Sequence, residues 1–194
     1  MNKLKFLFLI IITLVLVGCP ARTFYPLFTE KDLAFNPALV GTWTIEGDTY
    51  TFQKSGEKSY ELTHFQNDHP TDTAVFKAHL GKLGKYWFLD LFPERHALET
   101  HLKNGVYTHH LVPVHSISRV WFEGDSMRIA TLEADWLRKM IQNKKLKIPY
   151  IPNKEADDDQ FLVTASTKEL QSFVTKYADN KEAFPEPGVF HKLK

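Results

Sequence analysis

Apolar and polar residues alternate along the chain from residue 39 to residue 92, and this two-residue period is typical of β-strands. The alternation is interrupted by Glu46-Gly47-Asp48 and Ser55-Gly56-Glu57, which are typical of tight turns between antiparallel strands. The most apolar stretch is 86–92, so we expect it to lie centrally in a sheet. The pattern predicts an antiparallel meander of strands at 41–45, 49–53, 60–64, 74–80 and 86–92.

The second half of the chain mixes strand and helix periods. Strand material continues in 106–122, where Pro113 marks a bulge, an edge or a break, and a turn then leads into a strand at 127–130. Apolar residues at helical spacing predict helices at about 133–143 and at 167–178. Ser166 and Glu169 have the capping-box spacing before the second helix. The remaining expectations are a loop at 93–105, a strand at 161–165 and a tail at 185–194.

These elements predict a mainly β fold of about eight short strands, with two short helices late in the chain. A sheet of this size leaves exposed edges unless it closes, so we expect a barrel or a strongly bent sheet. An eight-stranded barrel has an interior that holds side chains or one small ligand. We expect a single β-rich domain over 39–194, which includes the C-terminal helix and tail.

The first predicted strand contains Gly41-Thr42-Trp43. This triplet resembles the Gly-x-Trp motif that opens the lipocalin and wider calycin barrels. The resemblance implies that Trp43 plugs one end of a barrel, that a C-terminal helix packs outside and that a basic residue stacks on the Trp. The sequence does not identify that basic residue, and the helix expected between the last two strands departs from the family pattern.

The chain begins with a short positively charged region that contains Lys3 and Lys5. An almost unbroken apolar run follows at 6–17. Twelve residues rise about 18 Å as a helix, whereas a bilayer core of roughly 30 Å needs about 20 residues. The run is therefore typical of a signal peptide. It ends in Leu16-Val17-Gly18-Cys19, which resembles the lipobox of bacterial lipoproteins.

The lipobox resemblance implies cleavage after Gly18 and acylation of Cys19, which becomes the mature N-terminus. The alternative is an uncleaved anchor with an incidental cysteine. Under the lipoprotein interpretation, 1–18 is the signal peptide and 19–38 is a lipidated tether, part of which packs on the domain. Cys19 is the single cysteine of the chain, so no internal disulfide forms in an oxidising compartment. We expect a bacterial envelope protein on the exported side of a membrane, with membrane lipid as its partner.

The amino-acid composition argues against two further classes of protein, those that coat nucleic acid and those that are disordered. Removal of 1–18 leaves 22 Lys and Arg against 23 Asp and Glu, a net charge of −1. This balance argues against a protein that coats nucleic acid, which usually needs a basic face. Aromatic residues at 13% and charged residues at 24% argue against disorder.

Apolar and aromatic side chains fall on the predicted inner faces of successive strands. Apolar walls with one or two polar groups are typical of small-molecule pockets, and equally of a filled core. Two functions follow: an anchored domain that binds a small apolar or amphipathic ligand, or a structural or protein-interaction lipoprotein with a filled core. His64 is either a hydrogen-bonded core residue or a polar group aimed into the pocket. The candidate pocket residues are Trp43, Tyr50, Phe52, Tyr60, Leu62, His64, Phe76 and Trp87.

Nine histidines invite a metal interpretation, but their spacing is unsuitable. On a strand, His109 and His115 would share a face about 20 Å apart, too far for one ion. The sequence contains no Gly-x-Ser-x-Gly motif, and its one cysteine belongs to the lipid, so we expect no metal, no cofactor and no enzymatic activity. A basic run follows the first late helix and is either a solvated helix end or a contact with lipid head groups; it consists of Lys139, Lys144, Lys145 and Lys147.

Overall fold

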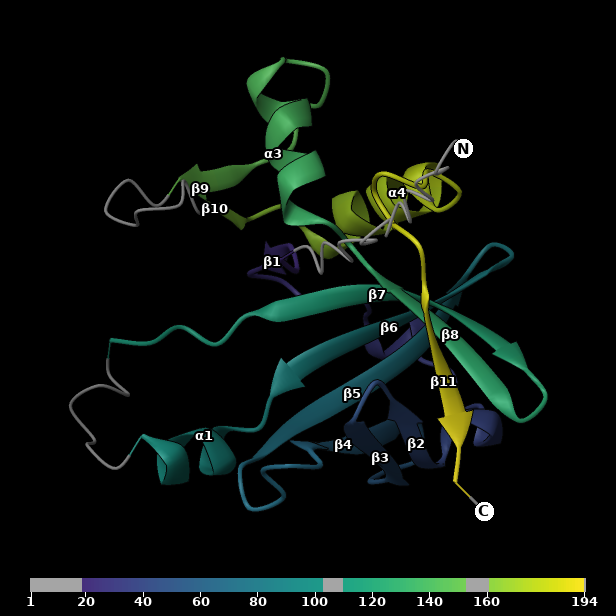
Figure 1. Ribbon diagram of the computed structural model, residues 1–194. Coiled ribbons are helices and arrows are strands. Elements are labelled where there is room, and N and C mark those ends of the chain that lie inside the picture. The colour runs from purple at the N-terminus through teal and green to yellow at the C-terminus, as the bar shows by residue number, and fades with distance from the viewer. Residues whose placement is uncertain (1–18, 103–109, 153–160, 194) are drawn as a thin grey trace, which may run out of the picture.

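The computed structural model describes residues 19–102, 110–152 and 161–193, which form an antiparallel β-barrel with the two late helices on one side (Figure 1). Eight strands pair in sequence order, and the last pairs with the first, which closes the barrel. The structure therefore confirms the predicted mainly β fold and its closure. The barrel strands are β2 (Gly41–Ile45), β3 (Asp48–Lys54), β4 (Ser59–Gln66), β5 (Thr73–Leu83), β6 (Tyr86–Pro93), β7 (His115–Glu123), β8 (Ser126–Thr131) and β11 (Gly188–Lys192).

The closing strand β11 corrects the sequence prediction, because it lies in the region expected to be a tail. Its residue Phe190 pairs with Met127 of β8, and His191 pairs with Thr44 of β2. Only Phe190 gives β11 a buried apolar side chain, so its alternation is too weak to mark a strand. The strand predicted at 161–165 does form, as β10 (Phe161–Val163), but it lies outside the barrel.

A small three-stranded extension continues from the N-terminal end of β7. There β1 (Arg22–Thr23) pairs with His115, β10 pairs with β1, and β9 (Tyr150–Pro152) pairs with β10. The strand β7 begins at His115, so the described residues before it, 110–114, are not part of the strand. The signal segment 1–18, the predicted strand residues 106–109 and His109 lie outside the described residues.

Helices α3 (Ala134–Gln142) and α4 (Thr167–Tyr177) confirm the two late helices. The capping box also forms, since the Ser166 backbone N–H donates to the Glu169 carboxylate at 2.8 Å. In Figure 1 these helices lie on one side of the barrel, opposite β2, β3 and β4. The amphipathic period of each helix explains why they were predictable.

A further helix, α1 (Arg95–His101), occupies part of the predicted loop, so that prediction was wrong. The Glu94 carboxylate accepts the Ala97 N–H at 3.1 Å at its start, and Arg95 pairs with Glu99 at 2.8 Å one turn apart. These stabilising contacts come from polar residues. Polar contacts of this kind leave no apolar period in the sequence, so the helix was not predicted.

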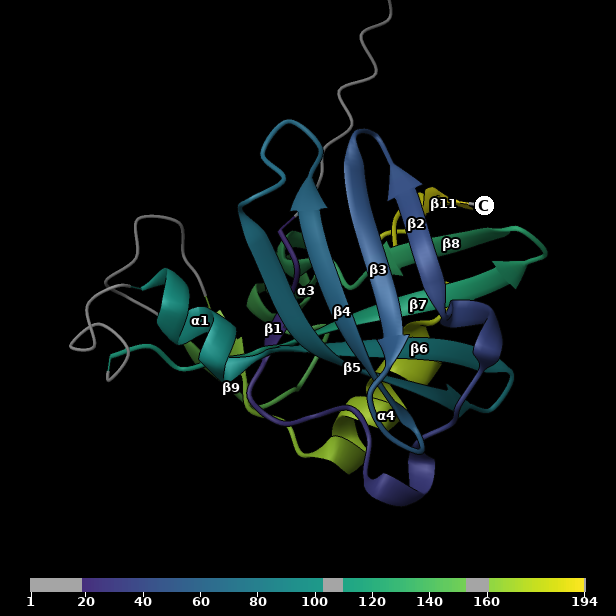
Figure 2. The same ribbon diagram turned by 90° about the horizontal axis from the view of Figure 1, so that it is seen from below.

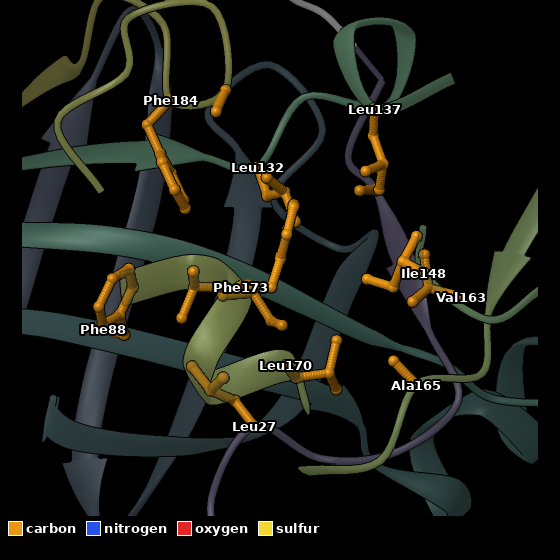
Figure 3. Packing of buried hydrophobic residues seen from close by; sticks show 14 of the residues in the cluster. Leu27, Phe88, Leu132, Leu137, Ile148, Val163, Ala165, Leu170, Phe173 and Phe184 are labelled. Carbon is orange, nitrogen blue, oxygen red and sulfur yellow. The ribbon is translucent and has the colours of Figure 1, made fainter. Parts of the chain in front are cut away.

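Two hydrophobic cores lie on opposite faces of the barrel wall. The inner core lies inside the barrel, and the outer core lies between the wall and the helices (Figure 3). Strand β6 supplies Leu89 to the inner core and Phe88 to the outer core, and both side chains are buried. Burial on both faces explains why 86–92 is the most apolar strand of the sequence.

The segment before the barrel packs closely on its outer wall. Ala21, Leu27 and Phe28 are buried in the outer core, and the Phe28 ring occupies the space that a side chain at Gly81 would need. The Ala134 N–H donates to the Cys19 carbonyl at 3.0 Å, so Cys19 itself contacts the domain. Two short 3₁₀ helices, η1 (Glu30–Asp32) and η2 (Pro37–Leu39), complete this segment.

Candidate functional site

The barrel interior brings together the eight candidate pocket residues of the sequence analysis. Seven of them belong to the inner core or pack against it, and the eighth, His64, contacts the Tyr50 ring at a centroid distance of 4.5 Å. Four of the eight are at most 1% exposed, so solvent does not reach these four side chains. These four are Trp43, Phe52, Tyr60 and Leu62.

Trp43 is held by a polar contact and a cation. Its indole Nε1 donates to the Leu39 carbonyl at 2.9 Å, and Lys192 Nζ lies 5.1 Å from the ring centroid. A Cβ at Gly41 would lie 2.5 Å from Lys192 Cε, and Gly41 also has a φ of +134°. Gly41 thus leaves room for the lysine that stacks on Trp43. The calycin resemblance implies a basic residue on this Trp, and Lys192 lies in such a position. The sequence analysis missed Lys192 because it lies in β11.

The segment before β2 closes this end of the barrel. The Tyr60 hydroxyl accepts the Asn36 N–H at 2.6 Å and donates to the Asn36 carbonyl at 3.1 Å. The Phe35 ring stacks on Tyr60 at a centroid distance of 5.2 Å. Burial raises the pKa of Tyr60 above its usual value, and the hydrogen bond with Asn36 opposes that rise. Phe35, Asn36 and Tyr60 therefore close this end of the barrel. Figure 2 shows the strands of the wall from below.

A polar trio lies toward the other end of the barrel. His64 Nε2 and Tyr50 Oη are 3.2 Å and 3.4 Å from the same Asp48 carboxylate oxygen, Oδ2. The His64 and Asp48 side chains are 25% and 29% exposed. Burial, followed by the Asp48 charge, raises the pKa of Tyr50 to about 12, so its hydroxyl stays protonated and donates to Asp48. His64 is thus a hydrogen-bonded residue of the barrel mouth.

An acid and a histidine meet on the outer wall. Asp90 is 1% exposed; its Oδ1 lies 2.8 Å from His115 Nδ1, and its Oδ2 accepts the Leu27 N–H at 2.8 Å. His79 is opposite Asp90 on β5, and burial lowers the His79 pKa against a smaller opposing effect of the Asp90 charge. Asp90 ties the leading segment to the barrel. Within residues 19–102, 110–152 and 161–193, no cluster of three or more His, Cys, Asp or Glu could hold a metal ion.

A cleft of about 510 Å³ lies outside the barrel, between α4 and the segment that follows α3. Its apolar side chains include Phe173 and Tyr177, whose ring centroids lie 6.2 Å and 5.1 Å from that of Trp136 on α3. Sequence reasoning missed this cleft because its two sides are about 20 residues apart in the chain. The cleft is lined by Leu146, Lys147, Ile148, Pro149, Lys168, Glu169, Ser172, Phe173, Lys176 and Tyr177.

Comparisons with protein-family models, with curated proteins and with solved structures find no match for this chain. The architecture itself defines the class: a closed eight-stranded antiparallel barrel, compatible with a calycin-like fold. Across the described ranges, no helix is both long enough and apolar enough to cross a bilayer.

Proposed function

We propose that this chain is a lipid-anchored lipoprotein of the bacterial envelope, in which the barrel is a filled scaffold and binding takes place on the outer surface. The observation that carries the proposal is the burial of Trp43, Phe52 and Tyr60 inside the barrel, each at most 1% exposed. Buried aromatic side chains of this size occupy the volume that a ligand would need. Tyr60 is also fixed by two hydrogen bonds with Asn36, so it is held in place.

The anchor rests on the lipobox resemblance and on the position of Cys19. Cys19 is exposed, and its carbonyl accepts the Ala134 N–H at the start of α3. Each buried acyl methylene contributes about 0.8 kcal/mol to membrane binding, so several chains on Cys19 anchor a domain firmly. Because Cys19 contacts α3 directly, such an anchor holds the helix-covered side of the barrel near the bilayer.

The proposed role is non-enzymatic, and it gives Asp90 a structural task. Both Asp90 carboxylate oxygens are engaged, one with His115 and the other with the Leu27 N–H. With both oxygens engaged, the Asp90 carboxylate itself has no free position from which to take a substrate proton. Here the carboxylate instead holds the leading segment on the barrel wall, which is a structural task.

The test of the anchor is the intact mass of the protein extracted from its own membrane. The proposal predicts the loss of residues 1–18 and a covalent gain of acyl groups on Cys19. The Cys19→Ser variant provides the control, and it should keep its N-terminal segment and carry no acyl groups. An unmodified Cys19 in the native protein would contradict the anchor.

A second candidate function is the binding of a small apolar ligand at the barrel mouth. The observation that favours it is the partly exposed trio of Asp48, Tyr50 and His64, which offers polar groups beside apolar walls. Stoichiometric binding of an apolar dye that is lost in His64→Leu but retained in a surface control, Val189→Thr, would favour this candidate over the filled scaffold.

A further inference from the structure

The cleft beside α4 combines a basic rim with an apolar interior. Lys168 and Lys176 reach it from α4, and Lys147 comes from the segment after α3. The same lining includes Phe173, Tyr177 and other apolar side chains. A cleft with charge of one sign focuses its field and attracts ions of the opposite sign. The cleft thus has two regions, one suited to an anionic group and one to hydrocarbon.

The positive charge of the rim is available to a ligand. In the described part of the chain, none of the three lysines takes part in an ion pair. The one carboxylate of the lining belongs to Glu169, which accepts the Ser166 N–H at 2.8 Å and the Ser166 hydroxyl at 2.7 Å. These bonds lower the Glu169 pKa and turn its charge toward the cap of α4. The rim therefore keeps an excess of two positive charges.

The surface beside the cleft has the character of a membrane interface. Tyr150 and Ile151, which follow the Leu146–Pro149 side of the cleft, are 42% and 58% exposed. Exposed lysines at 144 and 145 precede that side of the cleft. Aromatic and aliphatic side chains with nearby lysines are typical of surfaces that rest on anionic lipid.

The cleft also lies close to the anchoring residue. Ala134 of α3 bonds Cys19, and Trp136, two residues further on, packs against Tyr177 in the wall of the cleft. Figure 1 shows α3 and α4 on the same side of the barrel. A lipid anchor on Cys19 would thus bring the cleft to the bilayer, where anionic phospholipid is the abundant molecule that has both an acidic head and an acyl chain.

We infer that this cleft binds one anionic phospholipid of the anchoring membrane, its phosphate between Lys147, Lys168 and Lys176 and the start of its acyl chain against Phe173 and Tyr177. The inference rests on the proposed function, because the anchor on Cys19 supplies the lipid. It also explains the basic run 139–147 as part of a head-group surface. The protein would then meet its membrane in one fixed orientation.

Native mass spectrometry of the full mature protein, released from bilayers of equal phosphatidylcholine and phosphatidylglycerol, tests the inference. The expected result is one retained phosphatidylglycerol per chain and little phosphatidylcholine. The double variant Lys168→Gln/Lys176→Gln should retain at least about tenfold less of the anionic lipid. The matched control is Lys58→Gln/Lys77→Gln, which removes the same charge from two exposed lysines, one in the turn between β3 and β4 and one on β5, and should retain the lipid fully.

The possible outcomes separate the two proposals. An acylated Cys19 without retained phosphatidylglycerol contradicts the cleft alone, and an unmodified Cys19 with retained lipid contradicts the anchor alone. Equal losses in the two double variants would show a general charge effect and overturn the inference. Retention of added oleate in place of phosphatidylglycerol would assign the cleft to free fatty acid and also overturn it. Equal melting temperatures would confirm that all variants fold.

Discussion

The inner and outer cores differ in how the chain builds them, although they share one barrel wall. The inner core takes alternate residues from consecutive strands, with Trp43 and Leu62 as examples. The outer core joins distant segments, since Leu27 precedes the barrel, Phe88 lies on β6 and Leu170 lies on α4 (Figure 3). The inner core therefore follows from the local alternation of residues along the strands. The outer core depends on contacts between segments that are far apart in the chain.

The two cores also differ in how far they are enclosed, and therefore in how freely their side chains can rearrange. The inner core is enclosed by paired strands and closed at one end by the Asn36–Tyr60 contacts, so it has little room to rearrange. The outer core ends at a cleft along α4 that is open to solvent. The outer face of the wall therefore offers a cleft that is open to solvent, and the proposed binding takes place there.

The largest expected effect is that of Trp43→Ala in the inner core. Removing a large buried aromatic side chain costs about 3–5 kcal/mol of unfolding free energy. The indole bond to Leu39 and the contact with Lys192 disappear as well. Urea unfolding of the purified protein measures the loss, and a cost below about 1 kcal/mol would remove Trp43 from its role as the barrel plug.

The second effect concerns Asp90, which links the outer wall to the leading segment. Asp90→Ala leaves the buried Leu27 N–H without its partner, and we expect a loss of about 3 kcal/mol, since each hydrogen bond to a charged group contributes about 1.5–3 kcal/mol. Asp90→Asn keeps one acceptor oxygen and should lose less. Equal thermal stability for the two variants would show that the carboxylate oxygens do not hold this segment.

The third prediction tests whether the inner core is full. Phe76→Trp adds volume inside the barrel and should cost about 1–3 kcal/mol, as overpacking does. Val189→Trp, which adds bulk at a residue 42% exposed on β11, should change stability by about 0.5 kcal/mol or less. A Phe76→Trp protein as stable as the wild type would show that the interior has room for a ligand.

The fourth prediction separates charge from packing at the barrel plug. Lys192→Met keeps the stem beside Gly41 but loses the cation over Trp43, with an expected cost of about 0.5–1 kcal/mol. Lys192→Arg keeps the cation and serves as the control. If chemical denaturation ranks the methionine variant level with the arginine variant, the cation contributes nothing to the plug.

The smallest effect is a pH dependence from His79. Burial lowers its folded pKa below the ordinary 6.5, so its contribution to stability is complete above about pH 6.5 and declines as the pH falls toward the folded pKa. Carboxylates with lowered pKa, such as Glu94 and Asp179, titrate at still lower pH. Between about pH 7.5 and about pH 5.5, the melting temperature should fall more for the wild type than for His79→Gln. Parallel curves would exclude His79 as the source.

The sequence was sufficient to predict the helices and strands that bury one face, because burial of one face produces a regular period of apolar residues. Strands β2 to β5 and helices α3 and α4 bury one side each, so their periods are regular. Strand β11 was missed because its inner positions include Gly188 and Lys192, and α1 was missed because polar contacts start it. Strand β10 was assigned to the wrong place because pairing partners are set by the whole chain and not by the strand's own residues.

The residues of the candidate site also fall into a group that the sequence predicts, inside the barrel, and a group that it does not predict, at the outer cleft. The inner residues were found because they alternate, but alternation does not distinguish a pocket from a filled core. The cleft was not found because Lys147 precedes Lys168 by about 20 residues, and contacts of the folded chain, such as the pairing of Tyr150 with Val163, bring the two segments together. Convergence of distant side chains depends on tertiary structure, which a single sequence does not display.

Fluorine NMR of the protein labelled at its four tryptophans tests the central claim most directly. Trp43 and Trp87 report on the inner core, and Trp121 and Trp136 report on the outer core. The labelled protein is titrated with an apolar dye and, separately, with short-chain phosphatidylglycerol. A filled barrel with an outer binding surface predicts that phosphatidylglycerol shifts the Trp136 resonance and that neither ligand moves Trp43 or Trp87. A shift of Trp43 and Trp87 with Trp136 unchanged would contradict it.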